Sequence, residues 1–81
     1  MTPKQFRQLT SLQQMELLFE QGKELMSRIF VFYNIRLYAL GDFFVEVWYR
    51  QTTNKIDRIL VMGIDSVIDI YENQIKLNDL F

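Results

Sequence analysis

The stretch Phe43–Arg50, FFVEVWYR, decides the fold of this chain. It alternates in side-chain type, is dense in aromatic and β-branched residues, and lies between two turn-forming segments, Gly41-Asp42 and Thr52–Lys55. Such a run is typical of the middle strand of an antiparallel sheet. Both sides of this strand are largely apolar, although one apolar side is enough for an ordinary core.

The composition predicts one folded domain that spans residues 1–81. A chain of this size buries roughly 60–65% of the surface that its unfolded form exposes. The 49% apolar and 15% aromatic content is too high for a disordered chain. Cysteine and histidine are both absent, so disulfides are excluded and a structural zinc site is not expected. Stability must therefore come from side-chain packing, with or without self-association.

The charge pattern argues against nucleic acid as a partner. The net charge is −1, and the basic residues form no cluster or stripe that would neutralise phosphates. No apolar run is long enough for a membrane span, and the first ten residues do not resemble a signal peptide. We therefore expect a cytoplasmic protein with no membrane association.

The N-terminal segment predicts a kinked helix. Thr2 is a capping residue for a first piece over residues 3–8, and Ser11 restarts the pattern for a second piece over residues 11–21. Gly22 then ends the helix. Helical spacing gives the second piece a buried stripe, made of Leu12, Met15, Leu18 and Phe19.

The C-terminal segment predicts a second amphipathic helix. Asp65 or Ser66 would cap it, and apolar residues follow at intervals of three or four until about Gln74. The tail over residues 76–81 keeps enough apolar residues that we expect it to dock on the domain.

Between the helices the period changes towards two, which predicts a four-stranded antiparallel meander. The fold class is therefore α+β, with the meander flanked by the kinked N-terminal helix and the C-terminal helix. The tip of the first hairpin falls within Ile29–Phe32, which contains no turn-forming residue; a single bent strand over residues 24–39 is the alternative. The predicted strands cover residues 24–29, 33–39, 43–50 and 56–62.

The register of the second hairpin decides which residues share a face. A two-residue turn at Gly41-Asp42 would place Leu37 opposite Glu46 and mix apolar and charged residues. The neighbouring register places Leu37 opposite Val45 and pairs Arg36 with Glu46, which leaves one uniformly apolar face. We predict the second register. For the third hairpin both sides of the last strand are apolar, and its register stays open.

This register predicts a core face and a second, exposed face. Both helices are expected to pack on the face formed by Tyr33, Ile35, Leu37, Val45 and Val47. The opposite face would expose aromatic residues with charged residues around them, and this predicts a homodimer interface. The alternative is that the C-terminal helix covers this face and makes Trp48 part of the core. The predicted interface consists of Phe32, Tyr38, Phe44, Trp48, Arg36, Glu46 and Arg50.

Several segments resemble a family of short uncharacterised cytoplasmic proteins of Bacteroidetes-type bacteria. These are the kinked N-terminal helix ending in Gly22, the hairpin LYALGDFFVEVWY (residues 37–49), the return TTNKIDRI (residues 52–59) and the closing YENQIKLNDL (residues 71–80). The resemblance covers nearly the whole chain and implies an α-β-β-β-β-α layout. It implies no catalytic or binding residue, and the IFVF sequence at the first hairpin departs from the usual polar turn.

The chain lacks the residues that most enzymes use. Without histidine or cysteine there is no common general base and no thiol nucleophile, and the three glycines are too far apart for a phosphate-binding loop. Asp65 and Asp69 share a helix face near Asp57, but capping and solvent exposure explain them better than a metal site. We therefore expect no enzymatic activity and no cofactor.

The predicted function is a non-enzymatic protein-interaction or self-associating module with an unknown partner. The alternative is a small-molecule-binding domain with a pocket between the sheet and a helix. An RNA-binding sheet would also carry exposed aromatic residues, but the spacing of its motifs is absent and the isoelectric point is about 5.2.

Overall fold

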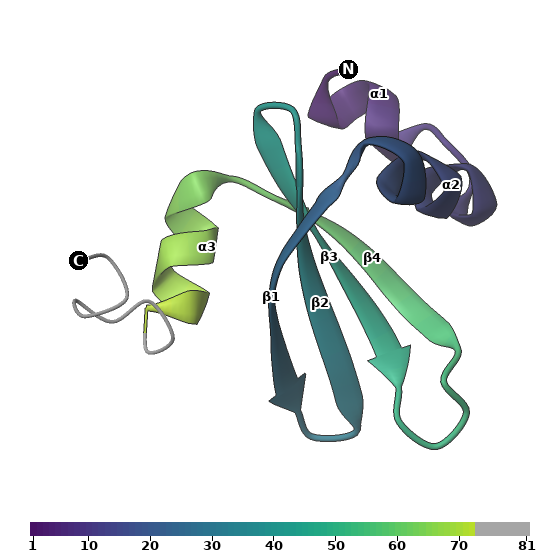
Figure 1. Cartoon of the computed structure of the whole chain (residues 1–81), viewed down its shortest axis with the longest axis vertical. Helices are drawn as coiled ribbons and strands as arrows, with labels where there is room; N and C mark the ends of the chain where they lie inside the picture. Colours follow the sequence, from purple (N-terminus) through teal and green to yellow (C-terminus); the bar gives the residue numbers. More distant parts are fainter. Residues whose placement is uncertain (73–81) are drawn as a thin grey trace.

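The computed structural model describes residues 1–72 and has the predicted α+β architecture (Figure 1). Four strands form one antiparallel meander in the order β1-β2-β3-β4, with helices before and after it. The predicted bounds of the strands are confirmed to within one residue. The elements are α1 (Pro3–Arg7), α2 (Ser11–Gln21), β1 (Lys23–Phe30), β2 (Tyr33–Leu40), β3 (Phe43–Arg50), β4 (Ile56–Met62) and α3 (Ile64–Tyr71).

Capping boxes start both N-terminal helices. In α1 the Thr2 side chain accepts a hydrogen bond from the Gln5 backbone N–H, and the Gln5 side chain accepts one in return from the Thr2 N–H. The predicted cap of α2 was one residue off, because Thr10 and not Ser11 occupies the position. The reason is that Thr10 has Gln13 three residues later and forms the same reciprocal pair.

Gly22 ends α2, as predicted, but the left-handed conformation common at helix ends is not the cause. Its φ is −77°, a value open to any residue. A Cβ atom at this position would lie 2.7 Å from the Leu18 carbonyl oxygen and 3.2 Å from the Leu18 Cδ2 atom. The chain therefore needs a glycine here so that it can turn closely over the end of α2.

Helix α3 starts differently from the prediction. Its N-cap residue is Gly63, which makes no side-chain capping hydrogen bond, so neither Asp65 nor Ser66 caps the helix. Instead Val67 and Tyr71 bury one side of α3 against the sheet. The predicted helix end near Gln74 and the predicted docking of residues 76–81 fall outside the described part of the chain.

The first hairpin forms as predicted, with Phe30 opposite Tyr33 and a two-residue connection at Val31-Phe32. Val31 takes a positive φ of 54° there. Such a conformation is unfavourable for a β-branched residue and is usually given to glycine or asparagine. The apolar tip is thus formed by residues that are poorly suited to a turn.

The predicted register of the second hairpin is wrong. Leu37 lies opposite Glu46 and Arg36 lies opposite Val47, so the connection is the two-residue turn Gly41-Asp42. Gly41 adopts a φ of 59°, which suits a tight hairpin turn. The prediction assumed that one face had to be uniformly apolar. This assumption fails because helices cover both faces of the sheet.

Helices α1 and α2 lie against one face of the sheet, and α3 lies against the other (Figure 1). The prediction that both ends of the chain pack on a single face is therefore wrong, and the alternative with Trp48 in the core is the observed one. On the N-terminal face the buried residues are Phe6, Met15, Leu18, Tyr38, Leu40, Phe43, Val45 and Val47. On the α3 face they include Leu37, Met62, Val67 and Tyr71.

Strand β4 supplies both faces, which settles the register that the sequence left open. Ile59 lies opposite Val47 and packs on the N-terminal face with Val61. Leu60 lies opposite Glu46 and packs on the α3 face. A β-bulge beside Trp48 and Tyr49 shifts the pairing near the start of β4.

Candidate interaction surface

The α3 face contains a fully buried carboxylate, Glu46, in the middle of β3. Arg28 on β1 donates to both of its oxygens, from Nε at 3.1 Å and from Nη2 at 3.3 Å. The Trp48 Nε1–H donates at 3.1 Å, and the Tyr71 hydroxyl donates at 2.6 Å. All these donors serve one carboxylate, which ties the edge strand and α3 to the centre of the sheet.

The electrostatics of this buried cluster favour the neutral phenol and the charged guanidinium. Burial, together with the hydrogen bond to Glu46 and its negative charge, raises the pKa of Tyr71 well above its ordinary value. Burial opposes the charge of Arg28, but the hydrogen bonds and charge of Glu46 outweigh this effect and raise the pKa of Arg28. Arg28 also lies 5.4 Å from the Trp48 ring centroid and 5.6 Å from that of Tyr71. The cluster is a stabilising network, because the side chains that donate hydrogen bonds to the Glu46 carboxylate also pack against one another.

The seven residues of the predicted interface do not form one surface. Tyr38 is buried on the N-terminal face, whereas Trp48 and Glu46 are buried on the α3 face, and half-buried Phe44 packs there too. The remaining three are exposed but lie apart, namely Phe32 at the first hairpin tip, Arg36 on β2 and Arg50 at the end of β3.

The predicted ion pair between Arg36 and Glu46 is also wrong, as a consequence of the register. Arg36 points to the N-terminal face, where its Nη1 atom lies 3.4 Å from Glu24. The partner that the sequence analysis missed is Arg28, whose place beside Glu46 depends on two strand registers together. No local pattern reveals such a pairing.

A further ion pair lies at the end of the sheet near the β3–β4 loop. The Arg50 Nη2 atom lies 2.6 Å from the Asp57 carboxylate, and the Tyr33 hydroxyl donates to the same oxygen at 3.0 Å. The hydrogen bonds from Arg50 are the main reason why the pKa of Asp57 lies below its ordinary value. Asp57 therefore has structural partners, and residues 1–72 contain no group of three acidic side chains that could hold a metal ion.

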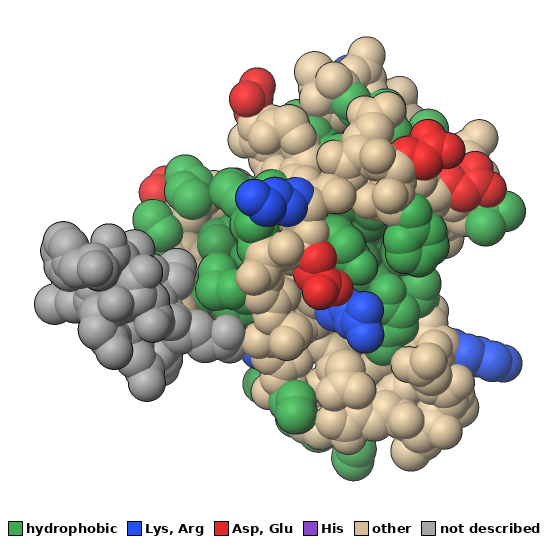
Figure 2. All heavy atoms as spheres, in the orientation of Figure 1, with side chains coloured by type: hydrophobic (Ala, Val, Ile, Leu, Met, Phe, Trp, Pro, Cys, Tyr) green, Lys and Arg blue, Asp and Glu red, His purple; other side chains and the backbone are tan. Residues whose placement is uncertain are grey.

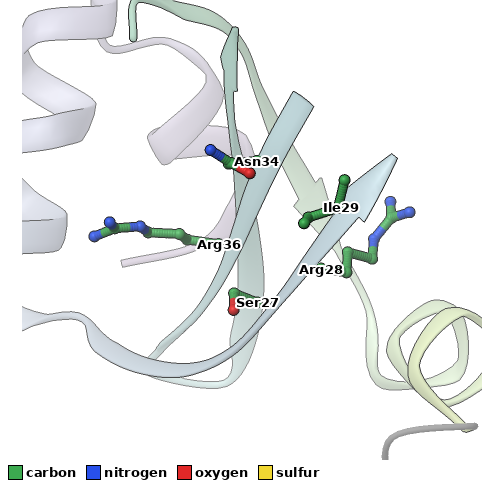
Figure 3. Close-up of a pocket in the computed structure, with 5 residues that line it drawn as sticks. All are labelled: Ser27, Arg28, Ile29, Asn34 and Arg36. Carbon is green, nitrogen blue, oxygen red and sulfur yellow. The ribbon is translucent and has the colours of Figure 1, made fainter. Parts of the chain in front are cut away.

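A polar hollow of about 450 Å³ lies over the β1–β2 hairpin (Figure 3). Ser27, Ile29, Asn34 and Arg36 line it, but the Arg28 side chain points away from Asn34 and Arg36. Since the one guanidinium on this side is already paired with Glu24, the hollow lacks the convergent polar groups of a ligand site.

An apolar groove of about 430 Å³ lies between α2 and the end of the sheet. It is open to solvent along one side, and hydrophobic side chains gather in the hollow below the N-terminal helices (Figure 2). Leu12 and Phe19 are 69% and 73% exposed although they belong to the predicted buried stripe of α2. Of the four residues in that stripe, only Met15 and Leu18 are buried, so its outer edge remains exposed to solvent. The groove is lined by Ser11, Leu12, Met15, Phe19, Tyr49 and Ile56.

The tip of the first hairpin exposes a second apolar surface. Its four consecutive residues Ile29, Phe30, Val31 and Phe32 are 73%, 51%, 62% and 67% exposed. A backbone hydrogen bond of 2.8 Å from Gln51 to Phe32 places the β3–β4 loop beside this tip. The hairpin tip, residues 29–32, is therefore an apolar projection at one end of the sheet.

Comparison of the chain with models of protein families, with curated proteins and with solved structures found no match. Within residues 1–72, no helix has the length and apolar character needed to cross a membrane.

Proposed function

We propose that this protein is a non-enzymatic interaction module of the cytoplasm that binds an apolar protein segment in the groove beside α2. The observation that supports this proposal is the exposure of Leu12 and Phe19 next to Met15, Tyr49 and Ile56. Contiguous exposed apolar surface that is partly hollowed is typical of sites that bind other proteins.

The charge around the groove favours a basic flank in the bound segment. Helix α2 carries Glu16 and Glu20 and contains no lysine or arginine. Glu16 is one turn from both Leu12 and Phe19, so it lies on the same side of the helix. Opposite charges at the rim of an interface increase its association rate and select the partner. The bound segment should therefore combine apolar or aromatic residues with lysine or arginine.

A small molecule is the second candidate occupant, because the groove volume of about 430 Å³ lies in the range of ligand pockets. Two features favour a protein segment. The groove is open on one side, and apart from the Tyr49 hydroxyl its only polar side chain is Ser11. Small-molecule sites usually enclose the ligand and fix it with several polar groups.

A library of short peptides tests the proposal. We expect the purified protein to select apolar, aromatic peptides with basic flanks and to lose them in the variant Phe19→Asp. The matched control Ile64→Asp changes another exposed apolar residue, which lies on α3, and should keep binding. If no peptide binds while small apolar compounds raise the melting temperature, the groove is a ligand site and the proposal fails.

A further inference from the structure

The chain itself carries a segment with the chemistry that the groove requires. The hairpin tip offers four exposed apolar side chains, two of them phenylalanines. Arg50, Lys55 and Arg58 lie on the adjoining end of β3, the β3–β4 loop and the start of β4, with Asp57 as the one acidic residue there. The tip is thus an apolar projection next to a surface with a net positive charge.

The tip cannot fill the groove of its own chain. Ile29 on β1, Asn34 on β2, Tyr49 on β3 and Ile56 on β4 form one row across the sheet. Three strand spacings separate Ile29 from Ile56, which is about 14 Å. The tip and the groove lie at the same end of the sheet, and each is left exposed. Ile29 faces the side of the groove, whereas the Phe30 ring packs on Trp48 at the opposite face.

The charges of the two surfaces are complementary. Glu16 lies one helical turn from Leu12 and Phe19 at the groove, and Figure 2 shows acidic side chains beside hydrophobic ones in the region of α2. The loop next to the tip carries the exposed Lys55. Arg58 is exposed too, but its guanidinium lies over the Trp48 ring on the α3 face. When the tip of one copy enters the groove of another, basic residues approach an acidic rim.

The conformation of Val31 is a further observation at the tip. A β-branched residue at a φ of 54° is unfavourable by about 1–2 kcal/mol relative to glycine. This strain has no compensation within the monomer, because the Val31 side chain is 62% exposed. Strained backbone positions cluster at functional sites, where the surrounding structure holds them in place.

We infer that two copies of this chain form a reciprocal dimer in which each hairpin tip occupies the groove of its partner. The inference rests on the proposed function of the groove and names its occupant. Because tip and groove are separate surfaces at one end of the sheet, a two-fold axis between two copies makes both contacts at once and leaves neither surface free.

The oligomeric state in light scattering tests the dimer. We expect the wild type to be dimeric at micromolar concentrations, and Phe19→Asp and Phe32→Asp each to raise the dimer dissociation constant about tenfold or more, as for residues at the centre of an interface. Ile64→Asp should leave it unchanged. Circular dichroism checks that all three variants are folded.

Mixing the two variants identifies the contact itself. Phe19→Asp retains a normal tip and Phe32→Asp retains a normal groove, so an equimolar mixture restores one intact contact for each pair of chains. We expect the mixed dimer to have a lower dissociation constant than the homodimer of either variant. Exchanging two charges tests the same contact. Glu16→Lys should weaken the dimer, and the double variant Glu16→Lys with Lys55→Glu should recover part of the lost affinity.

Three results would overturn the inference. These are a monomeric wild type at all concentrations, a dimer that survives both substitutions, and a monomer that binds vesicles of anionic phospholipid through Phe32. If peptides still bind the groove of a monomeric protein, the proposed function holds and only its occupant is wrong. If the dimer forms without the groove and no peptide binds, the proposed function fails as well.

Discussion

At the scale of single residues, Glu46 has the largest influence on the structure. It is fully buried, and its carboxylate accepts from Arg28, Trp48 and Tyr71. Removing one partner of a buried ion pair lowers the stability of a protein much more than replacing both partners. The effect of changing Glu46 therefore depends on whether Arg28 is kept.

We expect Glu46→Gln to lower the free energy of unfolding by about 3 kcal/mol, because it leaves a buried guanidinium without a counter-charge. The value is at the low end for buried pairs since Arg28 is 18% exposed. Urea denaturation measures the change. The control is Glu24→Gln, which removes an exposed ion pair and should cost about 0–1 kcal/mol. Equal losses in the two variants would contradict this account of Glu46.

Asp57 contributes stability at neutral pH that the protein loses in acid. Hydrogen bonds from Arg50 lower its pKa in the folded state, so the folded protein binds fewer protons than the unfolded chain. This contribution is complete above the ordinary pKa of aspartate, about 4, and is lost as the pH falls through the lowered value.

For Asp57→Asn we therefore expect weaker folding at neutral pH and a smaller loss of stability on acidification than in the wild type. Urea titrations at a series of pH values measure both effects. Asp69→Asn, a change at an exposed position of α3, should reproduce neither of them. If Asp57→Asn lost as much unfolding free energy on acidification as the wild type does, the ion pair with Arg50 would have no net effect on stability.

At the scale of the elements, the ends of the helices and strands were predictable and the pairing was not. Turn-forming residues and capping boxes are local, so α2 and β4 were predicted with their observed bounds. The register of β2 and β3 depends on which faces are covered, and β3 is apolar on both sides. The predicted register rested on a single covered face, and for the same reason the predicted partner of Glu46 was wrong and the predicted interface residues are scattered.

The closing turn of α2 leads to a prediction about glycine. Gly22→Ala should lower the free energy of unfolding by about 1–3 kcal/mol, because the new methyl group would meet the backbone of Leu18. Gly63→Ala is the matched control. No atom lies within 4 Å of a Cβ placed there, and its φ of −87° suits alanine, so thermal melts should agree with wild type within about 0.5 kcal/mol.

The first hairpin should show a conflict between stability and association. Val31→Asn places at a φ of 54° a residue that tolerates this conformation, as Asn54 does at 56° in the same chain. We expect the monomer to gain about 1 kcal/mol in unfolding free energy and the dimer to become weaker. Phe32→Asn, at a position without a positive φ, should weaken the dimer without the gain. Unchanged or lower stability in Val31→Asn would mean that the turn is not strained.

At the scale of the whole molecule, one sheet serves two separate hydrophobic clusters. Leu18 lies in the cluster on the N-terminal face and Met62 in the cluster on the α3 face. Both clusters rest on β2 and β3, so neither can form without the central hairpin. This arrangement explains how residues 1–72, which contain no cysteine, cover both sides of a four-stranded sheet.

Because both clusters share the β2–β3 hairpin, we expect the protein to unfold cooperatively. Leu18→Ala and Met62→Ala should each cost about 2–5 kcal/mol, and circular dichroism and Trp48 fluorescence should give coincident urea transitions in each variant. A change in Trp48 fluorescence that precedes the loss of secondary structure in Met62→Ala would instead show that the α3 face melts separately.

The groove was the part of the site that could not be predicted from the sequence. Leu12 and Phe19 have the spacing of core residues, and only the three-dimensional structure reveals that both side chains stay exposed at a groove. The hairpin tip was visible as an IFVF run with no turn residue, but its exposure was not. Apolar periodicity identifies which residues avoid water and does not identify whether their own chain covers them.

The buried position of Glu46 also has a consequence for how this sequence can change. Apolar residues in β3 could exchange with one another and still suit either side of the sheet, so most of the strand carries little information about its orientation. One carboxylate makes the two sides different, since a shift by one residue would turn it towards α2, away from Arg28 and Tyr71. Among diverged copies of this chain, we would look for substitutions to accumulate freely among the valines and to stop at this single acidic position.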